Sequence, residues 1–294
     1  MIDPVLPVAP SHQGKVRDTY AIPGREDLML LIATDRFSTH NVKHQSRIPG
    51  KGEQLAALTL AWKLKVFDRI GLKTHLVAWG RDLLDYLPQE WRASAPYRQA
   101  FVVEKHKVHP CEFVWRRYLA GSLFEAYRKG EDPYDLHLPP GLAKMHRFDE
   151  PIFTPTHKSE DDEPMPASEG RALFPEATAL TLKAFLAIEA ELAKAGVALI
   201  DSKFEAAGDV LVDEWGTGDC SRMALLSTIR EGEDPPWLDK EIGRQSALRN
   251  WAGGEKVPLE FAPDQVKAMQ DGYRKAIELI LGESLQAFQD RELG

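Results

Sequence analysis

Two kinds of periodicity in the hydrophobic and polar residues predict most of the secondary structure of this chain. A helical stripe of apolar side chains, spaced three or four positions apart, runs through residues 53–70 and stops before Gly71. Apolar runs and alternating patterns predict strands at 28–34, 75–79, 101–108 and 112–119. Further helices are expected at 122–129, 177–195, 240–251 and 263–291. Residues 130–176 are rich in Pro, Asp and Glu, which predicts long loops.

The most informative pattern lies between residues 201 and 222, which we interpret as a β-hairpin with charges on one face. Asp201, Lys203 and Glu205 alternate with uncharged residues, so a strand would point all three to the same side. A connection at 206–209 and a β-rich run then lead to Asp213. A return strand with Asp213 opposite Lys203 would gather three carboxylates around one ammonium. Such crowding favours a bound cation such as Mg²⁺, whereas the alternative is the solvated face of an edge hairpin.

Strands that come first and helices that concentrate later favour an α+β architecture with two lobes. With 294 residues, of which 43% are hydrophobic, the chain is long enough to bury a large core. The N-terminus has no basic segment followed by an apolar stretch, and no apolar run is long enough for a membrane span. Two cysteines are too few for a disulfide framework. We therefore expect a soluble, cytoplasmic protein that does not act on a membrane.

Basic residues are concentrated at a few places on an otherwise acidic chain. The net charge of −8 argues against general nucleic-acid binding. Local basic pairs, which suit small anionic ligands held in a cleft, occur at Lys15 with Arg17, Arg116 with Arg117, and Lys240 with Arg244. A strand interior seldom carries adjacent arginines, so one of Arg116 and Arg117 should point inward. Its partner would be a substrate anion or a structural Glu.

Two glycine-containing segments could contact phosphates, although the common nucleotide-binding motifs are absent from the sequence. The loop Gly14–Asp18 could cover phosphates with its backbone N–H groups while Lys15 and Arg17 neutralise charge, and a plain surface strand fits equally well. Residues 48–53 precede a predicted helix, where glycines could free N–H groups for an anion or simply form a loop.

The histidines and cysteines do not form a persuasive site. His106, His109 and Cys111 lack a nearby fourth metal ligand, and His40 and His44 are interpreted as loop residues. Cys220 has no evident partner histidine, so a nucleophilic thiol is not expected.

Seven segments in consistent order resemble the SAICAR synthetase family of purine biosynthesis. They are GKVRDTY at 14–20, ATDRFSTHNV at 33–42, IPGKGEQL at 48–55, VWRRYLAGS at 114–122, PIFTPTHKSE at 151–160, LIDSKFE at 199–205 and LVDEWGTGDCSR at 211–222. The resemblance implies an antiparallel β N-terminal lobe at 1–106, which covers ATP, and an α/β catalytic lobe at 107–294, with ATP between them. It also implies a ligase that joins L-aspartate to carboxyaminoimidazole ribotide and splits ATP to ADP and phosphate.

The resemblance also implies roles for individual residues. Asp201 and Lys203 would lie near the reacting groups, and Glu205 and Asp213 would bind Mg²⁺. ATP would be held by Gly14, Lys15, Arg17, Glu205 and Asp213. The ribotide and aspartate would be bound by Ser38, Arg116, Ser122, Lys158, Asp162, Arg222, Lys240 and Arg244, with Lys158 and Asp162 on a loop that covers the site.

The chain departs from the family pattern at three places. Asn41 stands where the family usually has Asp, Gly218 and Cys220 replace Pro and Ser, and the loop after Lys158 is shorter than usual. The alternatives are a related ATP-dependent phosphotransferase or carboxylate–amine ligase with another acceptor, and a catalytically inactive nucleotide-binding module. The sequence leaves the oligomeric state open, a homo-oligomer included.

Overall fold

The structure, a computed structural model, describes residues 6–159 and 161–294. Glu160, in the acidic run and in the block 151–160, lies outside the described residues, as does the start of the N-terminal segment. The chain forms two compact units: Met1–Ala61, His75–His106 and Lys240–Gly294 make the first, and Trp62–Thr74 and Lys107–Asp239 make the second. The lobes 1–106 and 107–294 stay a prediction, since the first unit also takes in the C-terminal segment.

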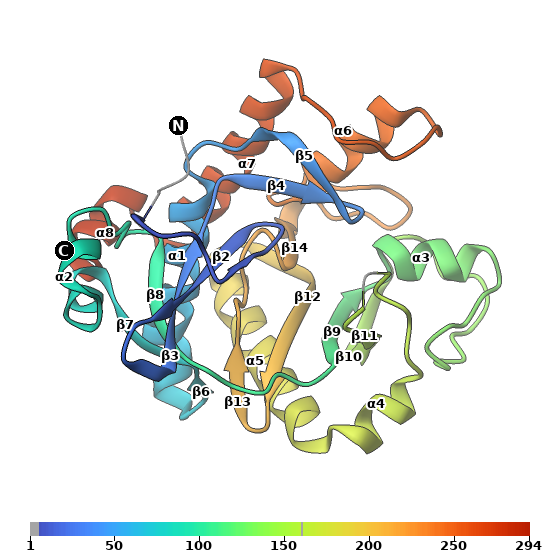
Figure 1. The fold of residues 1–294 in the computed structure, drawn as a ribbon. Helices are drawn as coiled ribbons and strands as arrows, with labels where there is room; N and C mark the ends of the chain where they lie inside the picture. The colour runs from blue at the N-terminus through green and yellow to red at the C-terminus, as the bar shows by residue number, and fades with distance from the viewer. Residues whose placement is uncertain (1–5, 160) are drawn as a thin grey trace. The chain divides into compact units, whose positions relative to one another are not determined.

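The first unit contains an antiparallel sheet in the order β1-β2-β3-β8-β7 (Figure 1). Its strands are β1 (His12–Gln13), β2 (Arg17–Ile22), β3 (Arg25–Ala33), β7 (Leu76–Trp79) and β8 (Ala100–Glu104). The predicted strand at 28–34 is the apolar part of β3, whose buried residues pack with Leu83, Leu87 and Trp91. Those three come from η3 (Gly80–Tyr86), the residue after it, and α2 (Gln89–Arg92), so these short elements cover one side of the sheet.

A two-stranded hairpin packs with the C-terminal helices of the same unit. It consists of β4 (Arg36–Thr39) and β5 (Val42–Arg47), joined by His40 and Asn41 with φ of 48° and 63°. A two-residue hairpin loop with both φ values positive favours Asn. Phe37 of β4 packs with residues from the unit's helices α1 (Lys51–Trp62), α6 (Glu241–Trp251) and α7 (Pro263–Leu281). The remaining helix is α8 (Leu285–Glu292).

The second unit is built on a seven-stranded sheet in the order β10-β9-β12-β13-β6, with β11 added to β9 and β14 added to β12. Its pairings are antiparallel except that of β13 with β6. The long helix α5 contacts β9, β12 and β13 and lies behind β12 in Figure 1. The strands are β6 (Lys73–Thr74), β9 (Cys111–Tyr118), β10 (Arg147–Phe153), β11 (Thr156–His157), β12 (Val197–Ala207), β13 (Val210–Val212) and β14 (Ser221–Leu225). The helices are η1 (Lys63–Phe67), η2 (Asp68–Ile70), α3 (Gly121–Arg128), α4 (Ala167–Leu173), α5 (Pro175–Lys194) and η4 (Leu226–Thr228).

The α+β architecture with antiparallel sheets is confirmed, and three predicted elements need correction. The loop region 130–176 contains β10, β11 and α4 and the start of α5. The helix predicted at 53–70 is α-helical only to Trp62 and continues as a π-helix and a 3₁₀-helix. The helix predicted at 263–291 ends at Leu281, because Gly282 adopts a left-handed φ of 72° and separates α7 from α8.

The predicted hairpin at 201–222 is present, with a shorter turn than expected. Ala207 pairs with Val210, so the connection is the two residues Gly208 and Asp209. Gly208 has a φ of 60°, which hairpin loops of this length require at their first residue. Within the described residues, no helix combines the length and the apolar character that a membrane span needs.

Candidate active site

Two arginines from neighbouring strands share one buried carboxylate in the sheet of the second unit. Arg116 on β9 and Arg222 on β14 both lie opposite Asp201 on β12. Their Nη1 atoms donate to Oδ2 of Asp201 over 2.8 and 2.7 Å. The three groups together carry a net charge of +1, and guanidinium groups have several N–H donors each. This arrangement could therefore accept a further anion.

Arg116 is fixed by polar side chains from two other segments. Its Nε donates to Oγ1 of Thr154 over 2.8 Å, and its Nη2 donates to Oγ of Ser122, at the start of α3, over 3.2 Å. Arg117 makes different contacts, because its guanidinium forms a bidentate ion pair with Glu189 on α5. One of the adjacent arginines was expected to point inward, but both are buried: Arg117 pairs with Glu189, and Arg116 pairs with Asp201.

Gly121 allows the backbone at the start of α3 to approach Arg222 closely. A Cβ atom on Gly121 would lie 2.5 Å from Nη2 of Arg222 and 2.6 Å from its Cζ. Gly121 also has a φ of 56°, a left-handed value that disfavours other residues. The Ala-Gly-Ser sequence at 120–122 therefore brings Ser122 to Arg116 while leaving room for Arg222.

A second charged group on the same strand surrounds Lys203. Its Nζ donates to Oε1 of Glu112 over 2.9 Å and to Oε1 of Glu205 over 3.0 Å. Lys158, in the segment after β11, forms an ion pair with the other oxygen of Glu205. Glu112 is further held by a hydrogen bond from Oγ1 of Thr156 over 3.2 Å. The contacts thus form a chain in which lysines and carboxylates alternate, from Lys158 through Glu205 and Lys203 to Glu112.

The pKa values in this group follow from its charges. Burial lowers the pKa of Lys203, but the carboxylates of Glu205, Glu112 and Asp213 raise it well above its ordinary value. Burial raises the pKa of Glu205, yet Lys203 and Lys158 together lower it to about 2. The sequence predicted three carboxylates near one ammonium, and three carboxylates do surround Lys203. Their identity differs from the prediction, because Glu112 takes the place expected for Asp201. The Asp201 carboxylate instead pairs with Arg116 and Arg222.

The loop after Asp213 has a strained and closely packed backbone. Asp213 itself has a φ of 66°, and Gly216 has a φ of 61°. The indole Nε1 of Trp62 donates to the carbonyl of Gly216 over 2.8 Å, and a Cβ on that glycine would lie 2.4 Å from the same nitrogen. Non-glycine residues with positive φ are concentrated at functional sites, so the conformation of Asp213 supports its candidacy.

Cys220 lies in this loop as a buried, free thiol. The Sγ atom accepts a hydrogen bond from the backbone N–H of Thr217, and that threonine's hydroxyl donates to Glu214 over 2.5 Å. Burial and the nearby Glu214 raise the pKa of Cys220 to about 11. The absence of a nucleophilic role, expected from the sequence, agrees with this environment.

In the first unit, the glycine-containing loop before β2 closes on itself. The backbone N–H of Gly14 donates to the carbonyl of Arg17 over 2.8 Å, and a Cβ on Gly14 would lie 2.9 Å from that oxygen. The Nζ atom of Lys15 donates to Oδ1 of Asn41 over 2.6 Å. Because position 41 is Asn where the family usually has Asp, the partner of Lys15 is a neutral amide. This contact therefore leaves the positive charge of Lys15 uncancelled.

The start of α1 is occupied by a carboxylate of the protein itself. Oδ2 and Oδ1 of Asp35 accept hydrogen bonds from the N–H groups of Gly50 and Gly52 over 3.1 and 3.0 Å. A Cβ on Gly52 would lie 2.8 Å from the carbonyl of Ala33. The glycines at 48–53 therefore serve close packing and capping, and the alternative of an ordinary structural loop is the better interpretation.

Of the remaining predicted residues of the first unit, Ser38 and Lys240 lie at the β4–β5 hairpin, and Arg244 lies on α6. Ser38 is buried on β4, and the ammonium of Lys240 lies 5.9 Å from the ring centre of its neighbour Phe37. Arg244, one turn along α6 from Lys240, pairs with Glu241 over 3.3 Å. His44, interpreted as a loop residue, is instead on β5 and packs against Phe37, Trp251 and Phe261.

The predicted site residues thus form groups within each unit. In the second unit they are Asp201 with Arg116, Ser122 and Arg222, and Lys203 with Glu205, Lys158 and Asp213. Asp162 lies in the following loop with a φ of 48°. Sequence reasoning missed Glu112, Thr154 and Gly121. Glu112 could have been found, because it shares strand parity with Arg116.

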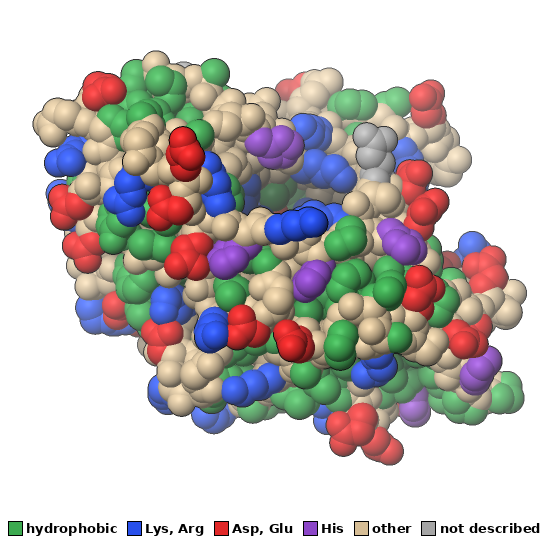
Figure 2. All heavy atoms as spheres, turned by 60° about the horizontal axis from the view of Figure 1, so that its bottom comes forward, with side chains coloured by type: hydrophobic (Ala, Val, Ile, Leu, Met, Phe, Trp, Pro, Cys, Tyr) green, Lys and Arg blue, Asp and Glu red, His purple; other side chains and the backbone are tan. Residues whose placement is uncertain are grey.

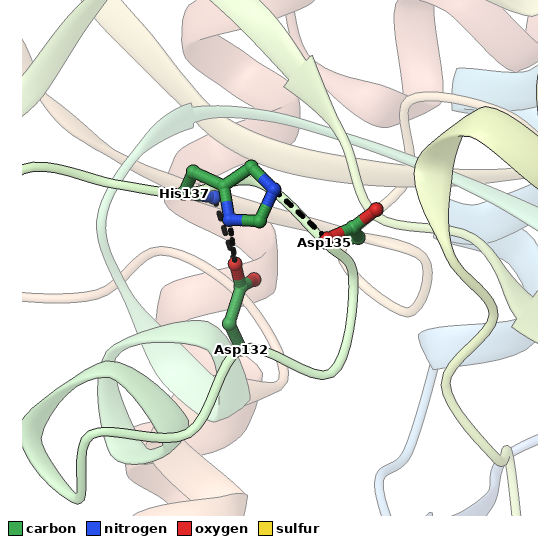
Figure 3. A group of neighbouring side chains, drawn as sticks. All are labelled: Asp132, Asp135 and His137. Atoms are coloured by element: carbon green, nitrogen blue, oxygen red, sulfur yellow. Dashed lines mark hydrogen bonds and ion pairs between the residues drawn. The ribbon is translucent and has the colours of Figure 1, made fainter.

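A separate group of possible metal ligands lies on the surface of the second unit. Among the described residues, Asp132, Asp135 and His137 bring their ligand atoms within 4.8 Å of one another (Figure 3). The Asp132 carboxylate accepts hydrogen bonds from the backbone N–H groups of Leu136 and His137 over 2.9 and 2.7 Å. All three side chains are exposed and the contacts explain a local turn, so we assign it a structural role.

Charged side chains are mixed over the face of the molecule in Figure 2. Lys and Arg side chains lie beside Asp and Glu side chains across much of this face.

Comparison with known proteins identifies the family. The profile of the SAICAR synthetase family matches residues 10–259. The phosphoribosylaminoimidazole-succinocarboxamide synthase of Desulfotalea psychrophila is 33% identical over 293 residues, covering 92% of this chain and 95% of that protein. The enzyme of the same name from Saccharomyces cerevisiae is 31% identical, covering 96% of each chain. The solved structure of SAICAR-synthase from Saccharomyces cerevisiae complexed with SAICAR has a TM-score of 0.80 and 28% identity, covering 95% of this chain and 96% of that one. With a match over most of its length, this chain belongs to the SAICAR synthetase family.

Proposed function

We propose that this chain joins L-aspartate to carboxyaminoimidazole ribotide in a reaction driven by ATP, giving SAICAR, ADP and phosphate. Its family membership makes it a carbon–nitrogen ligase of purine biosynthesis and disfavours a related enzyme with another acceptor. The observation that carries the proposal is the row of Asp201, Lys203 and Glu205 on β12, with its arginine and lysine partners. A cytoplasmic location fits two buried, free cysteines.

The chemistry requires that a carboxylate become a better electrophile. Transfer of the γ-phosphoryl group of ATP to an oxygen of the ribotide carboxylate would give an acyl phosphate and ADP. The aspartate amine would then attack the carbonyl carbon, forming the C–N bond, breaking the C–O bond to phosphate and losing a proton. Positive groups that stabilise the transferring phosphoryl group accelerate such reactions, and Lys203 is assigned this role.

Glu205 and Asp213 are assigned to Mg²⁺, and their chemistry fits this ion. Carboxylate oxygens are the ligands that Mg²⁺ prefers, and the pKa of about 2 keeps Glu205 ionised as a ligand must be. Asp213 lies close enough to Lys203 to raise its pKa, so it belongs to the same charged group. When bound, Mg²⁺ would neutralise phosphate charge.

The cationic residues are assigned to the anionic substrates. Arg116, Ser122 and Arg222 would bind a substrate phosphate or carboxylate, because the two arginines share a single carboxylate. Gly14, Lys15 and Arg17 are assigned to the ATP phosphates. Ser38, Lys158, Asp162, Lys240 and Arg244 are assigned to the ribotide or to aspartate.

The test measures ADP release with ATP and Mg²⁺ in four mixtures: no further substrate, ribotide alone, aspartate alone, and both together. Full turnover is expected only with both, accompanied by SAICAR. A fifth mixture replaces L-aspartate with L-glutamate, which should support little turnover. Equal rates without ribotide and aspartate, or a preference for another amine, would contradict the proposal.

A further inference from the structure

Glu205 is held by two ammonium groups from different segments of the second unit. Lys203 comes from the same strand and bonds to Oε1, whereas Lys158 follows β11 and pairs with Oε2. The Glu205 side chain is 10% exposed, and that of Lys158 is 40% exposed. Both carboxylate oxygens that could serve a cation are thus already engaged by protein ammonium groups.

The two lysines are not held equally. Lys203 contacts Glu112 as well as Glu205, and Asp213 adds to the negative charge around it. Lys158 is more exposed and reaches Glu205 at the outer side of the group. A charge entering beside Glu205 would therefore displace Lys158 more readily than Lys203.

The charges also favour exchange of Lys158 for a cation. With both lysines in place, the three carboxylates of Glu112, Glu205 and Asp213 exceed the two ammonium groups by one charge. A divalent cation added to this group would turn the excess positive and bring a third positive group to the Glu205 carboxylate, beside Lys203 and Lys158. Positive groups that contact the same carboxylate repel one another, and the repulsion is strongest where the groups are buried.

We propose that Lys158 is a built-in counter-ion for Glu205, which a divalent cation must displace when it binds. This inference rests on the proposed assignment of Glu205 as a cation ligand. Because linkage is reciprocal, Lys158 weakens cation binding by the same factor by which the cation weakens the Lys158–Glu205 pair. The released ammonium becomes available to an anionic substrate only after the cation has bound, which sets an order of binding.

The first test measures binding of Mn²⁺ alone, by electron paramagnetic resonance, at about 0.15 M salt, where distant charges are largely screened. Lys158→Met should bind Mn²⁺ about tenfold more tightly than the unaltered protein, a factor typical of coupled sites. Lys158→Arg keeps the charge and should change affinity little. Lys73→Met is the matched control, because it removes an exposed ammonium paired with Asp209 at the far turn of the same hairpin.

The second test follows Lys158 directly by reaction with an amine-acetylating reagent and mass spectrometry. Adding Mn²⁺ should speed acetylation of Lys158 several-fold and leave Lys73 unchanged. In Glu205→Gln, Lys158 should react fast without Mn²⁺, and thermal melting would verify that this variant is folded.

The outcomes separate this inference from the cation assignment. Loss of Mn²⁺ binding in Glu205→Gln, with unchanged or weaker binding in Lys158→Met, would leave the cation site in place and overturn the role of Lys158. If Lys73→Met raised the Mn²⁺ affinity as much as Lys158→Met does, the proposed role of Lys158 would be overturned too. Undiminished Mn²⁺ affinity in Glu205→Gln would instead overturn the cation assignment itself.

Discussion

Replacing Gly121 by alanine should damage the site through Arg222, which the new methyl group cannot avoid. The alanine Cβ would lie 2.5 Å from Nη2 and 2.7 Å from Nη1 of Arg222, well inside van der Waals contact. The guanidinium must then move, and the 2.7 Å bond from Arg222 to Asp201 is lost or weakened. Since both side chains are largely buried, solvent offers little compensation.

The expected magnitude has two parts that a matched variant separates. Alanine at a left-handed φ costs about 1–2 kcal/mol, and a hydrogen bond between charged groups contributes about 1.5–3 kcal/mol. Gly208 has a φ of 60°, close to the 56° of Gly121, but nothing lies within 4 Å of its Cβ position. Gly208→Ala should therefore lose only the backbone part of the unfolding free energy, whereas Gly121→Ala should lose about 2.5–5 kcal/mol in all.

The assay combines denaturant unfolding with steady-state turnover. Gly121→Ala should lower kcat/KM about 10- to 100-fold, the equivalent of the lost bond, while Gly208→Ala should stay near normal. In an Arg222→Ala background, the alanine at 121 has room and its extra loss of stability should vanish. Equal losses of stability in the two glycine variants, or normal turnover in Gly121→Ala, would refute the reasoning.

Three further predictions concern other parts of the molecule. Asp213→Asn should fold normally, because Asn tolerates the φ of 66°, yet lower kcat about a hundredfold, roughly 3 kcal/mol; near-normal steady-state turnover would remove the metal assignment. Burial, His40 and Lys240 lower the pKa of His44 to about 4, so thermal stability should be full above about pH 6.5 and fall as the pH drops toward 4. His44→Gln should flatten that dependence in melting curves, and an unchanged slope would contradict it. Cys111 and Cys220, with pKa values raised by burial to about 12 and about 11, should react with a thiol reagent only after unfolding, which absorbance during the labelling reaction can verify.

The sequence predicts best where a local period decides the structure. The alternation at 201–205 correctly placed three charges on one face of β12, and the apolar stripe after residue 53 correctly predicted α1. The strand β10 was missed because its pattern is interrupted: Pro151 and the shift in register between Arg147 and Ile152 remove the alternation. Its order comes from pairing with β9, which local sequence does not record.

The contrast between local sequence spacing and long-range strand pairing also explains which site residues were missed. Lys203 and Glu205 are neighbours on one strand, so their proximity follows from sequence spacing alone. Glu112, 91 positions away in the chain, reaches Lys203 only because β9 and β12 pair in the register that sets Lys203 opposite Val114. A shift of that register by one residue would turn Glu112 to the other face of the sheet. The charge balance around Lys203 therefore depends on strand pairing. Because local sequence does not record that pairing, Asp201 was expected beside Lys203, whereas it pairs with Arg116 and Arg222.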